Sequence, residues 1–188
     1  MPELMLYTET DNTMQEVGKN TPLPTGYTLK KISTSFTRPG GGDTTAYAAG
    51  DAITNSTTAP VVFSLDLSTI GAVAGQSIEM RKIAIVSSAK QTTLPLINVY
   101  LSATTFTATN DNAALDIDDT TMESGGAWFK CDTQNYTASN SRVSYTGIHE
   151  PMVLAAADTN LYGTLQAEAA YTPISGEKFT ILLWVALL

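Results

Sequence analysis

The sequence predicts an all-β fold, either a β-sandwich or a β-barrel. Several short segments rich in β-branched and aromatic residues are separated by clusters of Gly, Asn and Pro, which is typical of antiparallel sheets. Helical periodicity is weak along the whole chain. With 188 residues, 43% of them apolar, the chain is long enough for one domain with its own hydrophobic core.

Residues 1–26 are expected to form an extended N-terminal arm, followed by a β domain at residues 27–188. The stretch NTPLPTG at residues 20–26 holds two prolines and a glycine, which oppose regular strand pairing. The sequence leaves open whether the arm docks on its own chain or on a neighbour. Its candidate partner-binding residues are Leu4, Met5, Leu6 and Tyr7.

Seven segments of the β domain have strand character. Residues 59–67 alternate apolar and polar side chains with a period of two, as a half-buried strand does. In residues 77–88 the apolar side chains change face partway, which a β-bulge near Arg81 and Lys82 would explain. The expected strands cover residues 27–36, 59–67, 77–88, 94–103, 127–131, 160–171 and 177–188.

The last expected strand, residues 177–188, is apolar on both faces toward its end. One face would meet the core, and the other a second sheet edge or a partner subunit. Trp184 and Leu188 are therefore further candidate partner-binding residues. The apolar run is far shorter than the ~20 residues that span a bilayer, so we expect no membrane partner.

A short helical turn is expected in residues 111–124, with Asp111 as a possible N-cap. The segment is rich in acidic residues, whose oxygens could bind Ca²⁺. Their spacing does not match an EF-hand, so a solvated acidic loop is the main expectation and a bound cation the open alternative. The acidic residues are Asp111, Asp116, Asp118, Asp119 and Glu123.

The glycine-rich stretch FTRPGGGDTTAYAAGDAIT, residues 36–54, raises the question of a phosphate-binding loop. Such a loop needs its glycines at the start of a helix, usually with a following Lys and hydroxyl. Here Asp43 follows the glycines, and no βαβ pattern surrounds them. We expect a long connection between two strands instead.

No catalytic set is apparent, so an enzyme is not expected and no cofactor is predicted. His149 is the single histidine, and Pro151 and Val153 exclude an H-E-x-x-H zinc helix around it. No G-x-S-x-G nucleophile elbow occurs. The single cysteine, Cys131, is expected to fill the core.

The charge balance argues against nucleic acid as a partner. Only 15% of residues are charged, and the net charge is −8. An acidic surface repels phosphate backbones and anionic membranes. Solubility is expected to come largely from Thr, Ser and Asn.

Three strings resemble a family of virion structural proteins of tailed bacteriophages. FTRPGGGDTTAYAAGDAITNS is similar to the family's T-R-P-x-D-T-T-A-Y-A-A-G-D signature, with a GGG insertion after Pro39. FTATNDNAALDIDD resembles its F-x-D-N-A-A-x-x-x-x-D segment. LYGTLQAEAAYTPISGEKFTILL resembles its C-terminal L-Y-G-x-L-x-A-x-x-A-Y-T-P-x-S-G-E-x-F-T block. Residues 1–26 have no counterpart.

The resemblance implies a jelly-roll-like antiparallel β-sandwich that acts as a capsid decoration or cement protein on the virion surface. Its partners would be the major capsid protein and copies of itself, as a dimer or trimer. The alternatives are a head or tail appendage, or a module that binds host glycans. In the glycan reading, Tyr47, Tyr136 and Tyr145 would stack on sugars.

Overall fold

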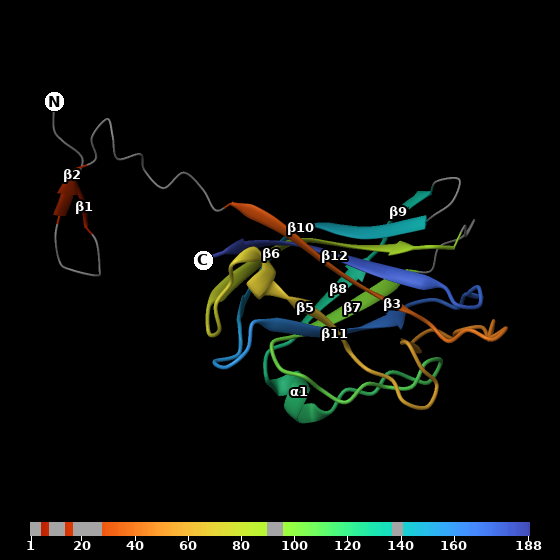
Figure 1. Ribbon diagram of the computed structural model, residues 1–188. Helices are drawn as coiled ribbons and strands as arrows, with labels where there is room; N and C mark the ends of the chain where they lie inside the picture. Colours follow the sequence, from red (N-terminus) through yellow and green to blue (C-terminus); the bar gives the residue numbers. More distant parts are fainter. Residues whose placement is uncertain (1–4, 8–13, 17–27, 90–95, 137–140) are drawn as a thin grey trace.

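Two antiparallel sheets face each other in the computed structural model, which describes residues 5–7, 14–16, 28–89, 96–136 and 141–188 (Figure 1). The first sheet has the order β3 (Leu29–Thr37), β12 (Lys178–Leu187), β6 (Ser77–Ser87), β10 (Ser141–Val153) and β9 (Thr133–Tyr136). The second has the order β4 (Ala52–Ile53), β11 (Asn160–Ala167), β7 (Ile97–Ser102) and β8 (Ala127–Cys131), with β5 (Phe63–Asp66) also paired to β11.

The strand order is that of a jelly roll. We count β4 and β5 as one interrupted strand and leave aside the short edge strand β9. The described sandwich then pairs its first strand with its eighth, second with seventh, third with sixth and fourth with fifth, all antiparallel. A long hairpin of four strand pairs wrapped around a core produces this arrangement. The predicted jelly-roll-like β-sandwich is confirmed.

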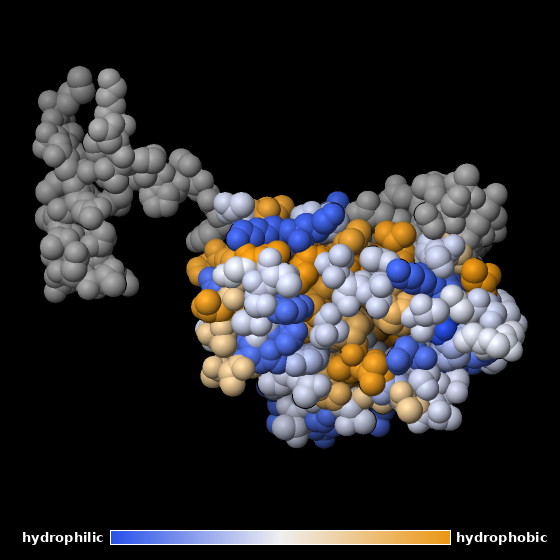
Figure 2. Space-filling model, viewed as in Figure 1, coloured by the Kyte–Doolittle hydropathy of each residue, from blue (hydrophilic) through white to orange (hydrophobic). Residues whose placement is uncertain are grey.

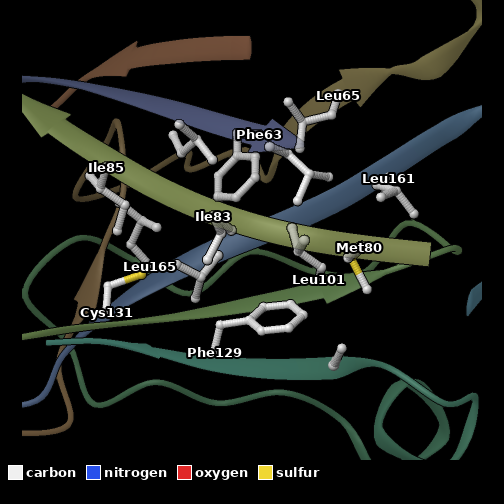
Figure 3. Packing of buried hydrophobic residues seen from close by; sticks show 14 of the residues in the cluster. Phe63, Leu65, Met80, Ile83, Ile85, Leu101, Phe129, Cys131, Leu161 and Leu165 are labelled. Carbon is white, nitrogen blue, oxygen red and sulfur yellow. The ribbon is translucent and has the colours of Figure 1, made fainter. Parts of the chain in front are cut away.

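The hydrophobic core lies between the two sheets. Alternate residues of each strand point inward, so β12 contributes Phe179, Ile181, Leu183 and Val185, all fully buried. Figure 3 shows Ile83 and Ile85 of β6 facing side chains of the opposite sheet, among them Leu165 and Cys131. Cys131 is fully buried and fills the core as expected.

The bulge predicted near Arg81 and Lys82 is present. Trp184 of β12 pairs with Lys82 but Val185 pairs with Met80, so Arg81 is the extra residue on β6. The pairing between β10 and β6 shifts at the same place. The bulge lets both Met80 and Ile83 point into the core, which resolves the change of face seen in the sequence.

The strand β10 was not predicted, although at 13 residues it is the longest strand described. It contains Gly147 and Pro151, which argue against a strand in the sequence. Pro151 is tolerated because β9 pairs only with Ser141–Ser144, so at Pro151 one edge of β10 lacks a ladder partner. β4 and β9 were also missed, and the segment 59–67 forms a strand only over β5.

Two short strands lie within the predicted arm. β1 (Met5–Tyr7) and β2 (Met14–Glu16) pair antiparallel, with Leu6 opposite Gln15. The arm was predicted to be extended, with regular pairing opposed only at residues 20–26, so this hairpin is an addition to the prediction. The boundary between arm and domain at residue 27 stays a prediction.

A long connection covers the outer face of the second sheet. It runs from β7 to β8 and carries the short helix α1 (Asp119–Glu123). Tyr100 of β7 points outward, donates a hydrogen bond to the Thr121 carbonyl at 3.1 Å, and packs edge-on against Phe106. The described helices, α1 and the single 3-10 turn η1 (Leu67–Ile70), are both too short to cross a membrane.

Candidate functional site

The side chain of Arg38 is completely buried where β3 ends and the glycine-rich connection begins. Its Nε donates to the Tyr47 hydroxyl at 3.0 Å, and Nη1 donates to the Asp43 carbonyl at 2.6 Å. Nη2 lies 3.2 Å from Asp111 Oδ2 and 3.4 Å from Asp43 Oδ2. A buried guanidinium needs such partners because burying an unpaired charge is very costly.

Asp111 is the buried counterion of Arg38. Its Oδ1 accepts hydrogen bonds from the Tyr47 hydroxyl at 2.7 Å and from the Thr54 N–H at 2.8 Å. Burial, together with the hydrogen bond to Asp111, raises the pKa of Tyr47 far above its ordinary value of 10. The Tyr47 phenol therefore stays protonated and keeps donating to the carboxylate.

The connection before β12 completes this cluster. The Tyr47 ring stacks on Tyr171 with ring centroids 5.0 Å apart, and the Tyr47 N–H donates to the Tyr171 carbonyl at 2.9 Å. The Arg38 N–H donates to the carbonyl of Glu177 at 2.9 Å. The buried Glu177 carboxylate accepts a hydrogen bond from the Ser87 hydroxyl of β6.

The three strings that resemble phage structural proteins thus meet in one place. We call Arg38, Tyr47, Asp111, Tyr171 and Glu177 the arginine cluster. It joins the connection between β3 and β4, the acidic connection, and the connection into β12. All five residues are buried and paired or stacked with one another, so the cluster ties the three connections together.

The glycine-rich stretch is a connection between strands, as predicted. It leads from β3 in one sheet to β4 in the other. Gly41 and Gly42 have φ values of 71° and 92°, a left-handed backbone that favours glycine. The turn brings Asp43 back onto Arg38, and the stretch precedes no helix.

The carboxylates of the acidic segment do not lie together in one site. Asp111 was expected as a possible helix N-cap, and this was wrong: it is taken by Arg38, and Asp118 caps α1. Asp118 accepts from the Thr121 N–H and from the Thr121 hydroxyl, both at 2.8 Å. Within the described part of the chain, no three His, Cys, Asp or Glu side chains are placed to hold a metal ion.

His149 lies at the surface on β10, with its side chain 66% exposed. Its Nδ1 is 2.9 Å from Glu79 Oε1, and Glu79 Oε2 is 2.6 Å from Arg81 Nη2. The three residues sit beside the bulge of β6 and not in a cleft. The arrangement is a surface charge cluster without a nucleophile.

The candidate partner-binding residues are placed as follows. Leu4 lies outside the described residues, and Met5, Leu6 and Tyr7 form β1, whose side chains are not described. Trp184 lies on the outer face of the first sheet, half-buried, with Lys82 Nζ 4.9 Å from its ring centroid. Leu188 is 45% exposed and borders a separate groove with Ser77, Met152 and Val153.

Of the tyrosines considered for stacking on sugars, only Tyr47 has a described side chain. Tyr47 is 1% exposed inside the arginine cluster, so its predicted contact with a sugar was wrong. The side chains of Tyr136 and Tyr145 lie outside the described residues. Neither Arg38 nor Tyr171 was assigned a role from the sequence. Charged residues are rare in this chain, yet the resembling strings contain Arg, Asp and Glu. This was the available signal in the sequence that could have pointed to the arginine cluster.

No protein-family model matches the sequence, and no curated protein is similar enough to match. Among solved structures, Desmodium yellow mottle tymovirus is similar with a TM-score of 0.29 and 13% identity, over 88% of this chain and 90% of that one. The virus-like particle of Macrobrachium rosenbergii extra small virus has a TM-score of 0.26 and 9% identity, over 97% and 94%.

A third similar structure is the D431N mutant VP2 protein of infectious bursal disease virus, in derived T=1 particles. Its TM-score is 0.19 and its identity 8%, over 99% of this chain and 45% of that one. Similarity this low carries no function from these structures to the present chain. What the described residues themselves establish is a two-sheet jelly roll with a buried arginine cluster.

Proposed function

We propose that the protein is a capsid decoration or cement protein of a tailed bacteriophage. In this role it binds the outer surface of the head shell and stabilises it by bridging neighbouring capsid subunits. Its partners are the major capsid protein and further copies of itself. The role is structural and involves no catalysed reaction.

The observation that carries the proposal is the arginine cluster. Arg38, Asp111 and Tyr171 come from the three strings that resemble phage structural proteins, and they interlock in the interior. The resembling residues therefore serve the scaffold itself, far apart in sequence but in contact in space. A resemblance carried by interlocking core residues extends to the whole β domain and not to one short motif.

The outer face of the first sheet is the best candidate surface for the shell. Half-buried Leu182 and Trp184 of β12 lie beside Ala84 and Lys82 of β6 on this face. Partly exposed apolar groups bordered by polar ones are typical of protein–protein contact surfaces. Elsewhere, hydrophobic and hydrophilic residues are interspersed on the side of the molecule seen in Figure 2.

The mechanism of stabilisation would be repeated burial of surface. A specific protein–protein interface buries about 1,600 Å² in total. A capsid repeats each contact many times, and linked contacts resist separation far better than single ones do. A protein with this role needs a rigid fold and surfaces that bind its neighbours.

The test uses heads of the encoding phage prepared without this protein. Adding the purified full chain is expected to give saturable binding and to raise the melting temperature of the heads. Trp184→Ala combined with Leu182→Ser should weaken binding at least about tenfold, because about 1.4 kcal/mol of apolar contact is lost. Val61→Ser removes an exposed apolar side chain from the segment before β5, on the opposite side of the sandwich, and should leave shell binding unchanged.

Circular dichroism of the two variants confirms that both remain folded. Heads that bind the chain without any rise in melting temperature would contradict a cement role. Immunogold labelling that places the chain on the tail would contradict the cement role and support the alternative role as an appendage.

A further inference from the structure

A groove of 640 Å³ lies over the outer face of the second sheet, on the side opposite to Trp184. One wall is the segment before and within β5, and the other is the segment after β7. Tyr162 of β11 lies between them. The lining residues are Thr58, Pro60, Val61, Val62, Ser64, Thr105, Phe106, Thr107, Ala108, Asn110 and Tyr162.

The groove offers polar side chains that are not used inside the protein. Four aliphatic hydroxyls and one amide line it, and among the described residues none of these five side chains hydrogen bonds to another protein group. Hydroxyl and amide groups can both donate and accept. They are Thr58, Ser64, Thr105, Thr107 and Asn110.

The two aromatic side chains of the groove are held in place by residues that do not line it. Phe106 packs edge-on against Tyr100 with ring centroids 5.5 Å apart. The Tyr162 hydroxyl donates to the Asp158 carboxylate, outside the groove lining. A ring fixed by such contacts presents its apolar surface without paying further ordering entropy when a ligand binds.

The groove has no charged lining residue, although the chain carries 18 Asp and Glu and 10 Lys and Arg. An anionic or cationic ligand would therefore find no counterion in it. A ligand matched to this lining is neutral, carries many hydroxyls that donate and accept, and has apolar ring faces.

We propose that this groove binds a neutral oligosaccharide. Tyr162 and Phe106 supply apolar contact to sugar rings. The five polar side chains pair with sugar hydroxyls along the open groove. This site is independent of the shell-binding face, because it lies on the other sheet.

The test titrates the ¹⁵N-labelled full chain with neutral hexasaccharides of β-linked glucose, of mannose and of galactose, observed by NMR. At least one should bind saturably with a Kd of about 1 mM or tighter. The amide shifts should concentrate at residues 58–64 and 105–110. A hexasaccharide of galacturonic acid serves as the anionic comparison and should not bind.

The variants separate ring contact from fold. Tyr162→Phe keeps the ring but loses the hydrogen bond to Asp158, so it should retain most of the binding, whereas Tyr162→Ala should weaken it about tenfold or more. Thr107→Val removes one free hydroxyl and should weaken binding, while the matched Thr44→Val, at an exposed position outside the groove, should not.

The proposal is overturned if no neutral hexasaccharide shifts the groove amides, or if Thr107→Val binds as well as Thr44→Val. Binding of the galacturonic acid oligomer alone would also overturn it. None of these outcomes bears on shell binding, which depends on Trp184 and is measured on phage heads.

Discussion

The Arg38 side chain connects segments that are far apart in the sequence. It contacts Asp43 and Tyr47 nearby, and Asp111 and the Ile174 carbonyl at long range. Five donors in a planar fork can satisfy this set, whereas the single ammonium of Lys cannot. The stability of the connections therefore depends on this one side chain more than on any surface ion pair.

Replacing Arg38 with Met should lower the free energy of unfolding by about 3–5 kcal/mol, because Asp111 is left buried without its counterion. The double variant Arg38→Met with Asp111→Leu should recover part of this loss. Urea unfolding measures both. Lys178→Met, an exposed cation at the start of β12, is the control and should change stability by less than about 0.5 kcal/mol. Equal losses for Arg38→Met and Lys178→Met would contradict the role of the cluster.

Asp118 makes the cap of α1 sensitive to acid. The backbone N–H of Thr121, then its hydroxyl, hold the pKa of Asp118 below its ordinary value of 3.8. A group whose pKa is lowered by folding stabilises the fold fully above its unfolded pKa. That contribution is lost as the pH falls through the lowered pKa.

Asp118→Ala should therefore lower the melting temperature near neutral pH, and the difference from the parent chain should shrink below pH 3.8. Thermal melts at several pH values measure it. Asp119→Ala removes the same charge from the first turn without removing the cap, so it should show the smaller effect at neutral pH. A difference that grows in acid would refute the assignment of Asp118 as the cap.

At the scale of elements, the sequence predicted strands best where one face is buried. Alternation located β5, β-branched and aromatic content located β3, and the break in alternation within β6 located the bulge at Arg81. β10 was not predicted because Gly147 and Pro151 argue against a strand. They are tolerated because β10 is only partly paired with its neighbours, and this tertiary feature cannot be read from the sequence. The arginine cluster escaped for the same reason, since nothing local in the sequence says which acid a buried arginine meets.

Gly163 is a packing requirement of the central strand β11. A Cβ at this position would lie 2.6 Å from the Tyr100 carbonyl oxygen and 2.4 Å from Phe63 Cζ. Gly163→Ala should therefore destabilise the fold by about 1–3 kcal/mol through overpacking. Gly40→Ala is the matched control, because a Cβ there meets nothing within 4 Å. Thermal unfolding compares the two, and equal stabilities would show that β11 can shift to make room.

At the scale of the molecule, lysines gather around Trp184 on the first sheet, whereas carboxylates gather on the connection that carries α1. The outer face of the first sheet carries Lys31 and Lys82 on either side of Trp184, whereas nearby Arg81 is paired with Glu79. The acidic connection with exposed Asp116, Asp119 and Glu123 lies beyond the second sheet, as the position of α1 in Figure 1 shows. We therefore expect copies of the chain to attract each other through these unlike surfaces, in a head-to-tail contact.

Self-association should accordingly weaken as salt rises from about 50 mM to about 500 mM, since the Debye length falls below the range of surface charges. Sedimentation velocity measures the shift toward monomer. Lys31→Glu reverses a charge on the basic face and should weaken association further, whereas Lys178→Glu, at the far end of the same sheet, should matter less. Association that is indifferent to salt would rule out the charge-based contact.

The position of β12 has a consequence for biosynthesis. It lies between β3 and β6, so the middle of the first sheet is filled by the last strand along the chain. While the ribosome is still translating residues 178–187, the edges of β3 and β6 that β12 will cover remain unpaired. These edges can then pair with strands of other chains. The nascent polypeptide cannot close its sandwich until translation of this strand is complete, and a chain that stalls just short of it is expected to aggregate.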